Sequence, residues 1–320
     1  MPVGHAELLD GRVRYIQEAQ GIGSGQYATT PISIYNMPLL TLQELEQMTP
    51  LFRGTAGRFM GRNAMRLLSI DRLNALYDRH SHLSGPDFAH SILQDLGIEY
   101  DVFAETSEVT SQLRTLHNGQ PFITISNHPY GSIDGIILAD FFGHLCPSYK
   151  IMVNKILSRI EALSSSFISV TPTGVERTAA TTESILGIRR ALTQLRSGGA
   201  LGLFPSGAVS DLSLRDHCIR DREWQPAIIR LIAKAQVPIL PVRFFDGNSQ
   251  FYYLLGLIDW RIRLLRLPSE VFNKAGRPAR LSIAPFISVE QQQEYLSTHS
   301  IEEFGLWLRS KVYGMSMRRW

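Results

Sequence analysis

Cysteine is scarce in this sequence: only Cys146 and Cys218 occur among its 320 residues. They lie far apart, and no CxxC pair or Cys/His spacing of a zinc ligand set is present. A disulfide framework and a structural zinc site therefore have no support. We expect two separate buried thiols, as in proteins of a reducing compartment.

A long apolar run is also missing. A membrane-spanning helix needs ~20 mostly apolar residues. The best candidate, residues 133–146, contains Asp134, Asp140 and His144, and the next, residues 251–258, is too short. The first twenty residues lack the basic and apolar regions of a secretory signal. If this protein meets a membrane, we expect it to lie on the surface.

Charge of one sign is not in excess, since 32 Lys and Arg stand against 29 Asp and Glu. Together with 44% apolar residues, this balance excludes an intrinsically disordered chain. Basic residues do not cluster with aromatic residues on one predicted sheet, so we expect no nucleic-acid partner. The sequence also lacks the G-x-S-x-G elbow, the P-loop, a G-x-G-x-x-G turn after a strand and the H-E-x-x-H metal site.

Helical periodicity dominates the first third of the chain. Residues 41–44 read as a capping box that opens a helix, and further helices are predicted at residues 55–68 and 70–79 and from Ser84 to about Gly97. The first thirty residues read as irregular. We expect residues 1–98 to form a helical N-terminal region.

Beyond residue 98, short apolar runs alternate with helical stretches. This alternation favours a mostly parallel sheet covered on both faces. The predicted fold class is α/β, a mostly parallel mixed sheet flanked by helices, with residues 99–320 as the core and a helical C-terminal tail. Strands are predicted at residues 100–103, 121–126, 150–153, 167–170, 200–204, 238–244 and 280–284. Helices are predicted at residues 132–142, 154–163, 179–196, 225–235 and 289–312.

The most informative segment is the polar turn after the predicted strand at residues 121–126. His128 lies in this turn, and Asp134 lies in the first turn of the next helix. If the turn folds back, Asp134 can accept a hydrogen bond from one imidazole nitrogen and leave the other as a general base. Backbone N–H groups at the helix start would suit a developing oxyanion. These parts favour acyl transfer to a hydroxyl or an amine, although a lone histidine at a helix start is more often a cap or a surface residue.

A second turn follows the predicted strand at residues 200–204. It consists of Phe204, Pro205, Ser206 and Gly207. Proline and glycine favour a sharp bend with exposed backbone amides. Because open α/β sheets bind ligands at the carboxyl ends of their strands, we expect this turn to form the opposite wall of the His128 site.

These two turns carry a resemblance to a known superfamily. The chain reads Asn127-His-Pro-Tyr-Gly131-Ser-Ile-Asp134-Gly, then Phe204-Pro-Ser-Gly207, then Val237-Pro-Ile-Leu-Pro-Val242. In order and spacing this resembles the glycerolipid acyltransferases of the 1-acylglycerol-3-phosphate acyltransferase type. Residues 244–249 and 266–276 look like a bacterial branch labelled hemolysin or ornithine-lipid-type acyltransferase. The resemblance covers about residues 73–287.

The resemblance implies roles for residues of both turns. His128 would be the catalytic base, Asp134 would orient it, and substrate would contact Asn127, Gly131 and the turn made of Phe204, Pro205, Ser206 and Gly207. The implied donor is an acyl thioester, either acyl-carrier protein (acyl-ACP) or acyl-CoA. The implied acceptor is a lyso-lipid at a membrane surface. No metal and no organic cofactor is implied.

Three departures from the superfamily pattern bear on the acceptor. Five residues rather than four separate His128 from Asp134, Ser206 stands where a glutamate is expected, and residues 167–172 lack an arginine. Arginines recognise phosphate-bearing acceptors, so their absence disfavours lysophosphatidic acid and favours an amino-lipid or another lyso-lipid. Two alternatives remain open: an N-acyltransferase acting on an amine, and a membrane-associated binding protein that has lost turnover.

Two segments combine positive charge with apolar residues. One is a stripe of arginines at every fourth position of the predicted helix at residues 55–68. The other is the segment 260–267. Basic and apolar interfacial helices bind anionic lipid, so we predict that both segments dock the protein peripherally on the cytoplasmic side of the membrane; a solvated helix face is the alternative. The docking residues are Arg58, Arg62, Arg66, Trp260, Arg261 and Arg263.

Overall fold

The structure is a computed structural model that describes residues 5–9, 12–16, 42–43, 53–116, 119–154, 157, 159–170 and 182–317. Seven strands lie where the sequence predicts them. They are β3 (Tyr100–Ala104), β4 (Ile123–Ser126), β5 (Lys150–Asn154), β6 (Phe167–Val170), β7 (Leu201–Leu203), β10 (Ile239–Phe244) and β11 (Ala279–Ile283). Four more were not predicted, β1 (His5–Leu9), β2 (Arg12–Ile16), β8 (Asp211–Ser213) and β9 (Cys218–Arg220).

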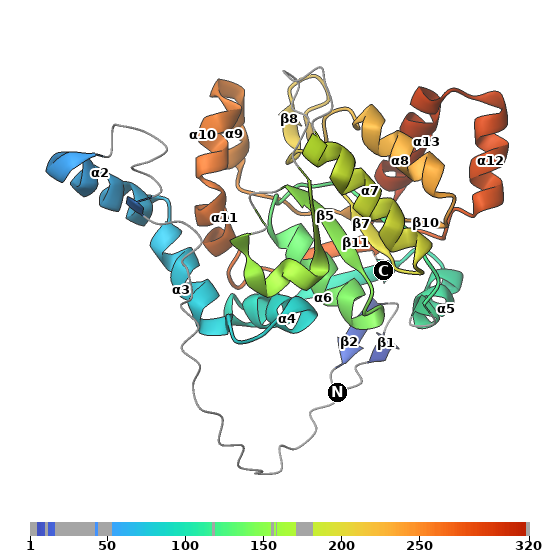
Figure 1. Cartoon of the computed structure of the whole chain (residues 1–320), viewed down its shortest axis with the longest axis horizontal. Coiled ribbons are helices and arrows are strands. Elements are labelled where there is room, and N and C mark those ends of the chain that lie inside the picture. Colours follow the sequence, from blue (N-terminus) through green and yellow to red (C-terminus); the bar gives the residue numbers. More distant parts are fainter. Residues whose placement is uncertain are drawn as a thin grey trace, which may run out of the picture.

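Within the described residues, nine strands form one sheet in the order β1-β2-β3-β11-β10-β4-β7-β5-β6. From β3 to β6 every neighbouring pair is parallel except β10 and β11. The hairpin β1-β2 extends the edge antiparallel to β3, and β8 pairs with β9 in a separate hairpin. The predicted α/β class with a mostly parallel mixed sheet is confirmed (Figure 1).

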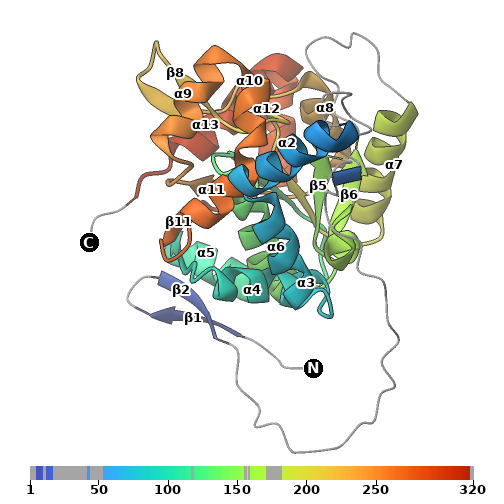
Figure 2. The same ribbon diagram turned by 90° about the vertical axis from the view of Figure 1, so that its left-hand side faces the viewer.

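Helices cover both faces of this sheet (Figures 1 and 2). One layer contains α4 (Gly85–Asp95) and α6 (Ile133–Leu145), and the other contains α7 (Thr182–Arg196), α8 (Pro226–Ala235) and α13 (Ile301–Gly314). The remaining helices are α2 (Gly54–Leu67), α3 (Ile70–His80), α5 (Ser107–Arg114), α9 (Gln250–Ile258), α10 (Trp260–Leu265), α11 (Leu267–Asn273) and α12 (Val289–Thr298). No helix within the described ranges is both long and apolar enough to cross a bilayer.

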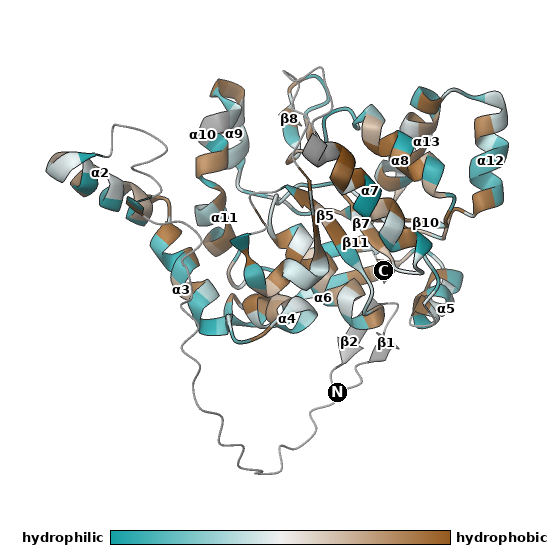
Figure 3. Ribbon diagram, in the orientation of Figure 1, coloured by the Kyte–Doolittle hydropathy of each residue, from teal (hydrophilic) through white to brown (hydrophobic). Residues whose placement is uncertain are grey.

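The central strand β4 shows why the strands of this sheet appear in the sequence as continuous apolar runs. Ile123 and Ile125 are fully buried against the layer of α7, α8 and α13. Thr124, between them, points to the other face, where its hydroxyl shares a 2.7 Å hydrogen bond with the hydroxyl of Tyr149. A strand buried on both faces loses the alternation of polar and apolar residues. Brown, hydrophobic colour accordingly marks the strands at the centre of Figure 3.

Three expectations about local structure were wrong. Residues 5–9 and 12–16 are the paired strands β1 and β2 instead of irregular chain. The Asp10-Gly11 pair between them in the sequence is a hairpin signal that could have been read. The described part of residues 154–163 contains no α-helix: β5 continues to Asn154, and a 3₁₀ helix follows at Glu161–Ser166. Cys146 is buried as expected, but Cys218 is exposed on β9.

Several predicted helices are confirmed, and others were not predicted. The helices predicted at residues 55–68, 70–79 and 84–97 are present as α2, α3 and α4, and the C-terminal tail forms α12 and α13. The capping box at residues 41–44 lies mostly outside the described residues. Residues 250–273, considered only as a short apolar run and a basic segment, form the three consecutive helices α9, α10 and α11.

Candidate active site

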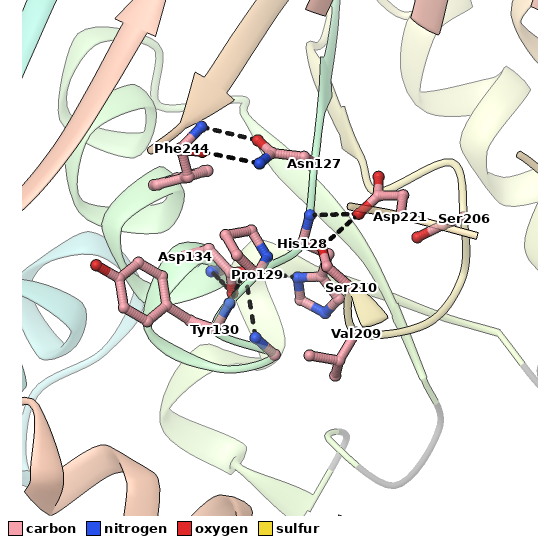
Figure 4. Close-up of polar contacts among 12 residues, drawn as sticks. Asn127, His128, Pro129, Tyr130, Asp134, Ser206, Val209, Ser210, Asp221 and Phe244 are labelled. Atoms are coloured by element: carbon pink, nitrogen blue, oxygen red, sulfur yellow. Dashed lines mark hydrogen bonds and ion pairs between the residues drawn. The ribbon is translucent and has the colours of Figure 1, made fainter. Parts of the chain in front are cut away.

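The ends of three central strands meet at one edge of the sheet. β4 is parallel to both β7 and β10, so their carboxyl ends lie side by side. The turn after β4 carries His128, and the turn after β7 begins at Phe204. The backbone N–H of Ser210 donates to the carbonyl of His128 at 2.9 Å. The two turns singled out in the sequence are therefore neighbours in space (Figure 4).

His128 and Asp134 form the hydrogen bond that the sequence predicts. Nδ1 of His128 lies 2.8 Å from Oδ2 of Asp134, whose side chain is fully buried. The same Oδ2 accepts the backbone N–H groups of Tyr130 at 3.1 Å and Gly131 at 3.2 Å. The turn therefore curls around this carboxylate, which binds three of its residues. This curl accommodates the extra residue between His128 and Asp134.

Gly131 makes this curl possible. Its φ of +75° is a conformation that side chains rarely adopt. A Cβ atom there would lie 2.5 Å from Cγ2 of Val209, on the opposite turn. Gly131 therefore has a structural reason to be glycine, in addition to the predicted substrate contact.

The carboxylate of Asp134 binds three backbone N–H groups at and just before the start of α6. Asp134 takes the N–H groups of Tyr130 and Gly131 with Oδ2, and that of Gly135 with Oδ1 at 2.9 Å. A carboxylate at a helix start satisfies the unpaired donors of the first turn. These three N–H groups therefore hold Asp134 and are not available to an oxyanion, while an oxyanion site at the other amides of the helix start stays a prediction.

The imidazole of His128 is held on both sides. The ring of Phe204 packs against it with a centroid distance of 4.0 Å and an interplanar angle of 30°. The side chain of His128 is 17% exposed, and no described residue forms a hydrogen bond with Nε2. Burial by itself would lower the pKa of His128, but the charge of Asp134, its hydrogen bond and the charge of Asp221 together raise that pKa above the ordinary value.

Asp221 is the functional-site residue that the sequence did not reveal. It follows β9, and its buried carboxylate accepts the backbone N–H of His128 at 3.1 Å and the hydroxyl of Ser210 at 2.6 Å (Figure 4). Asp221 is 93 positions from His128. Because arginines flank it on both sides, the local sequence predicts a solvent-exposed charged residue and does not indicate a role in the site.

Asn127 has a structural role, and its predicted contact with substrate stays a prediction. Its amide oxygen accepts the N–H of Phe244 at 2.7 Å, and its amide nitrogen donates to the carbonyl of Phe244 at 2.8 Å. Asn127 is buried. The two hydrogen bonds continue the β4-β10 ladder beyond the strand ends and fix the start of the His128 turn.

The turn at residues 204–207 also differs from the prediction in part. Pro205 and Ser206 are buried, and the hydroxyl of Ser206 donates to the carbonyl of Ala208 at 2.8 Å. These two residues stabilise the turn instead of facing a ligand. Phe204 is partly exposed and Gly207 is exposed, so they remain the members of this turn that substrate can reach.

The predicted docking residues divide into two groups. Arg58, Arg62 and Arg66 are exposed on α2, and Trp260 is exposed at the start of α10. The side chain of Arg261 lies outside the described residues. Arg263 contradicts the prediction.

Arg263 is buried, so it cannot face a membrane. It donates to the carbonyls of Val209 at 3.0 Å and Ser210 at 3.1 Å and forms an ion pair with Asp211. Its position on α10 turns it inward, which the sequence pattern of three nearby arginines could not show. Arg263 therefore anchors α10 to the turn after β7.

No group of three or more His, Cys, Asp or Glu side chains in the described part of the chain is placed to hold a metal ion. The chemistry available at this edge is that of an imidazole, two carboxylates and hydroxyl groups. Such a set can move a proton to and from an attacking hydroxyl or amine.

Several known proteins are similar to this chain. The chain is 24% identical over 215 residues to a lyso-glycine lipid O-acyltransferase of Bacteroides thetaiotaomicron, covering 65% of this chain and 73% of that protein. It is 22% identical over 233 residues to a lyso-glycine lipid O-acyltransferase of Phocaeicola vulgatus, covering 71% and 77%. A crystal structure of PlsC, the 1-acyl-sn-glycerophosphate acyltransferase of Thermotoga maritima, aligns over 85% of this chain and 90% of that chain with 15% identity and a TM-score of 0.43.

A family model spans nearly the whole described core. The family described as Acyltransferase matches residues 45–317, a range that includes both turns of the site and all helices from α2 to α13. This chain therefore belongs to the acyltransferase family and is an acyltransferase.

Proposed function

We propose that this acyltransferase moves a fatty acyl group from an acyl thioester to the hydroxyl of a lyso-lipid, with His128 as general base. The observation that carries the proposal is the 2.8 Å hydrogen bond between Nδ1 of His128 and Oδ2 of the buried Asp134. This bond holds one tautomer, in which Nδ1 carries the proton and Nε2 is free to accept another.

The reaction follows from that tautomer. Nε2 of His128 takes the proton of the acceptor hydroxyl, whose oxygen attacks the thioester carbonyl. The C–O bond forms, the C–S bond breaks, and the departing thiolate takes the proton back from the imidazolium. Asp134 stabilises the imidazolium between these two steps.

The acceptor we propose is a lyso-amino-lipid. Two relatives at 24% and 22% identity are named lyso-glycine lipid O-acyltransferases. The lack of an arginine in residues 167–172 supports the same choice, because a phosphate-bearing acceptor is usually held by arginine. The donor is an acyl thioester, carried by acyl-carrier protein or by CoA.

We also propose that the protein docks on the cytoplasmic membrane surface through α2, α9 and α10. α2 and the α9-α10 pair lie on the same side of the molecule in both views (Figures 1 and 2). The Arg72 guanidinium on α3 lies 4.0 Å from the ring centroid of Phe272 on α11. We name the exposed side chains of these helices the docking face. It comprises Arg58, Phe59, Met60, Arg62, Arg66, Leu67, Phe251, Leu254, Leu257, Ile258, Trp260 and Leu265.

The docking face is connected directly to the catalytic turn. The hydroxyl of Tyr253, on α9, donates to the carbonyl of Pro129 at 2.7 Å. Apolar side chains that enter the bilayer boundary would thus bring the His128 turn to the depth at which a lyso-lipid presents its hydroxyl. Basic residues add about 1 kcal/mol each near an anionic surface.

The decisive experiment offers purified protein an acyl thioester with candidate acceptors in vesicles. Acyl-ACP and acyl-CoA are compared as donors, and lyso-glycine lipid, lysophosphatidic acid and a long-chain amine as acceptors. We expect O-acylation of the lyso-glycine lipid. An amide product would make the protein an N-acyltransferase, and thioester hydrolysis alone would make it a thioesterase. Lipid binding without turnover would support the binding-protein alternative. Each of these three outcomes overturns the proposal.

A further inference from the structure

Asp221 is a buried carboxylate that the mechanism above does not use. Oδ1 accepts the backbone N–H of His128 at 3.1 Å and the hydroxyl of Ser210 at 2.6 Å, and Oδ2 accepts the indole N–H of Trp224 at 3.2 Å. Each of these groups donates toward the carboxylate, which is the arrangement that favours an ionised acid. One side chain therefore joins the turn after β4 to the loop after β7.

The backbone of Asp221 is fixed as firmly as its side chain. Its N–H donates to the hydroxyl of Tyr313 at 2.7 Å, and its carbonyl accepts a hydrogen bond from the guanidinium of Arg309. Both partners belong to α13. The carboxylate therefore reaches the catalytic turn from a loop residue after β9 whose backbone is tied to α13, in the layer of helices on one face of the sheet.

The charged and titratable groups around Asp221 are few. His128 faces it from the turn after β4, and Tyr313 and Arg309 contact it from α13. Burial is the largest effect and raises the pKa of Asp221 above its ordinary value, although hydrogen bonds from Ser210, His128 and Trp224 reduce that rise.

The neighbouring arginines are paired elsewhere. Arg220 pairs with Asp216, and both Arg222 and the buried Arg263 pair with Asp211. Arg263 also donates to the carbonyl of Ser210, so a positive charge contacts the same residue whose hydroxyl binds Asp221.

We propose that Asp221 is a positioning residue for His128, which locks the backbone of the catalytic turn against the loop after β7 and supplies a second negative charge that stabilises the imidazolium. This inference rests on the proposed role of His128 as the base. Hydrogen bonds to a buried carboxylate are strong because they are charge-assisted. A base whose backbone and ring are both held by hydrogen bonds stays in its reactive orientation when it takes a proton.

Asp221→Asn tests the proposal because it keeps the shape and removes the charge. The full-length protein is measured in vesicles at several pH values, and the His128 ring is titrated by NMR. We expect kcat to fall ~10–100-fold with KM for donor and acceptor nearly unchanged. The pKa of His128 should fall as one of its two negative neighbours is lost, so the acid limb of the pH profile should move to lower pH.

Asp216→Asn is the matched control. It removes the same charge from the exposed loop between β8 and β9, where Asp216 pairs with Arg220, and should leave kcat and the His128 titration unchanged. If Asp221→Asn does not fold, Ser210→Ala removes only the 2.6 Å hydroxyl bond to Asp221. In that variant we expect kcat to fall several-fold at constant KM, and wild-type kinetics would overturn the proposal.

The outcomes separate this inference from the proposed function. A kcat and a His128 titration of Asp221→Asn that match the wild type overturn the positioning role. A loss of rate without a shift of the His128 pKa also overturns it, since that result describes packing alone. Full activity of His128→Ala, by contrast, overturns the proposed function, whatever Asp221→Asn does to the titration.

Discussion

At the scale of single residues, the site depends on two side chains that compete for the same proton. His128 is partly buried, which disfavours its charged form, whereas Asp134 favours it. The sum of these effects is a raised pKa for His128, whose side chain remains partly exposed to solvent. Such a base can accept a proton from a hydroxyl and return it to a thiolate.

The first prediction concerns the base itself. His128→Ala should lower the rate of acyl transfer by ~10²–10⁴-fold, the usual contribution of a general base. The variant should fold, because His128 lies in a turn at the edge of the sheet and not in either apolar core. Circular dichroism and a thioester assay measure both properties. His82→Ala, at an exposed position, is the control; a His128 variant with more than half the wild-type rate would contradict the mechanism.

The second prediction is the direction of the pH dependence. The base acts in its neutral form, so activity should be lost as pH falls through the pKa of His128. Asp134 and Asp221 raise this pKa, and the acid limb of log kcat/KM should therefore lie above the ordinary histidine value of about 6.5. Asp134→Asn should move the limb to lower pH and reduce kcat, because the tautomer is no longer held. A profile that is flat from pH 5 to 9 would refute the assignment.

The third prediction tests the curl of the turn. Gly131→Ala places a Cβ 2.5 Å from Val209 and strains a φ of +75°. Overpacking of this kind costs ~1–3 kcal/mol, so the urea midpoint should fall. Gly314→Ala has nothing within 4 Å of the new Cβ and is expected to be neutral. Equal midpoints for the two variants would show that the turn adjusts freely.

At the scale of elements, exposed faces of helices carry the proposed membrane contact. α2 projects from the body of the molecule in Figure 1, with Gly57, Gly61 and Met65 buried on one side and arginines on the other. α9 buries Tyr252 and Tyr253 and exposes apolar side chains outward. Exposed apolar side chains on two segments at one side of the molecule are typical of an interaction surface.

The fourth prediction follows from the arginine stripe. Charge reversal of Arg58, Arg62 and Arg66 to Glu should weaken binding to anionic vesicles and leave the melting temperature almost unchanged, because all three side chains are exposed. Salt should weaken wild-type binding in the same way, since the Debye length is ~8 Å at physiological ionic strength. A pelleting assay with anionic and neutral vesicles measures both effects.

The control for the stripe is an equal change of charge elsewhere. Arg189, Arg190 and Arg196 are exposed on α7, and their reversal to Glu alters the net charge by the same amount. If the stripe docks the protein, only the α2 variant should leave the vesicles. Equal losses would indicate a response to net charge, and unfolding of the α2 variant would assign the stripe to the fold.

At the scale of the whole molecule, the proposed activity has a cellular signature. Loss of the gene should cause the singly acylated amino-lipid to accumulate and its doubly acylated form to disappear, because the enzyme would consume the first to make the second. Lipid mass spectrometry of cells with and without the active gene measures both pools. Restoration by the wild-type chain, but not by His128→Ala, is expected; unchanged pools would contradict the proposed acceptor class.

The sequence by itself determined much of the local structure. Apolar runs placed β3, β4, β5, β6, β7, β10 and β11, since strands buried on both faces must be apolar. The alternation of strands with helices indicated a mostly parallel sheet, and the pair His128 and Asp134 could be read because both lie within one strand-turn-helix unit. Short-range features of this kind are encoded in neighbouring residues.

Only the tertiary structure decided which distant residues serve the site. Asp221 reaches His128 across 93 positions of sequence, Arg263 turns inward to the carbonyls of Val209 and Ser210, and Asn127 bonds to Phe244 across 117 positions. Each of these polar groups is buried and must find its hydrogen-bond partners wherever the sheet order brings them. That order, with β4 between β7 and β10, is set by long-range packing, which no local pattern of residues records.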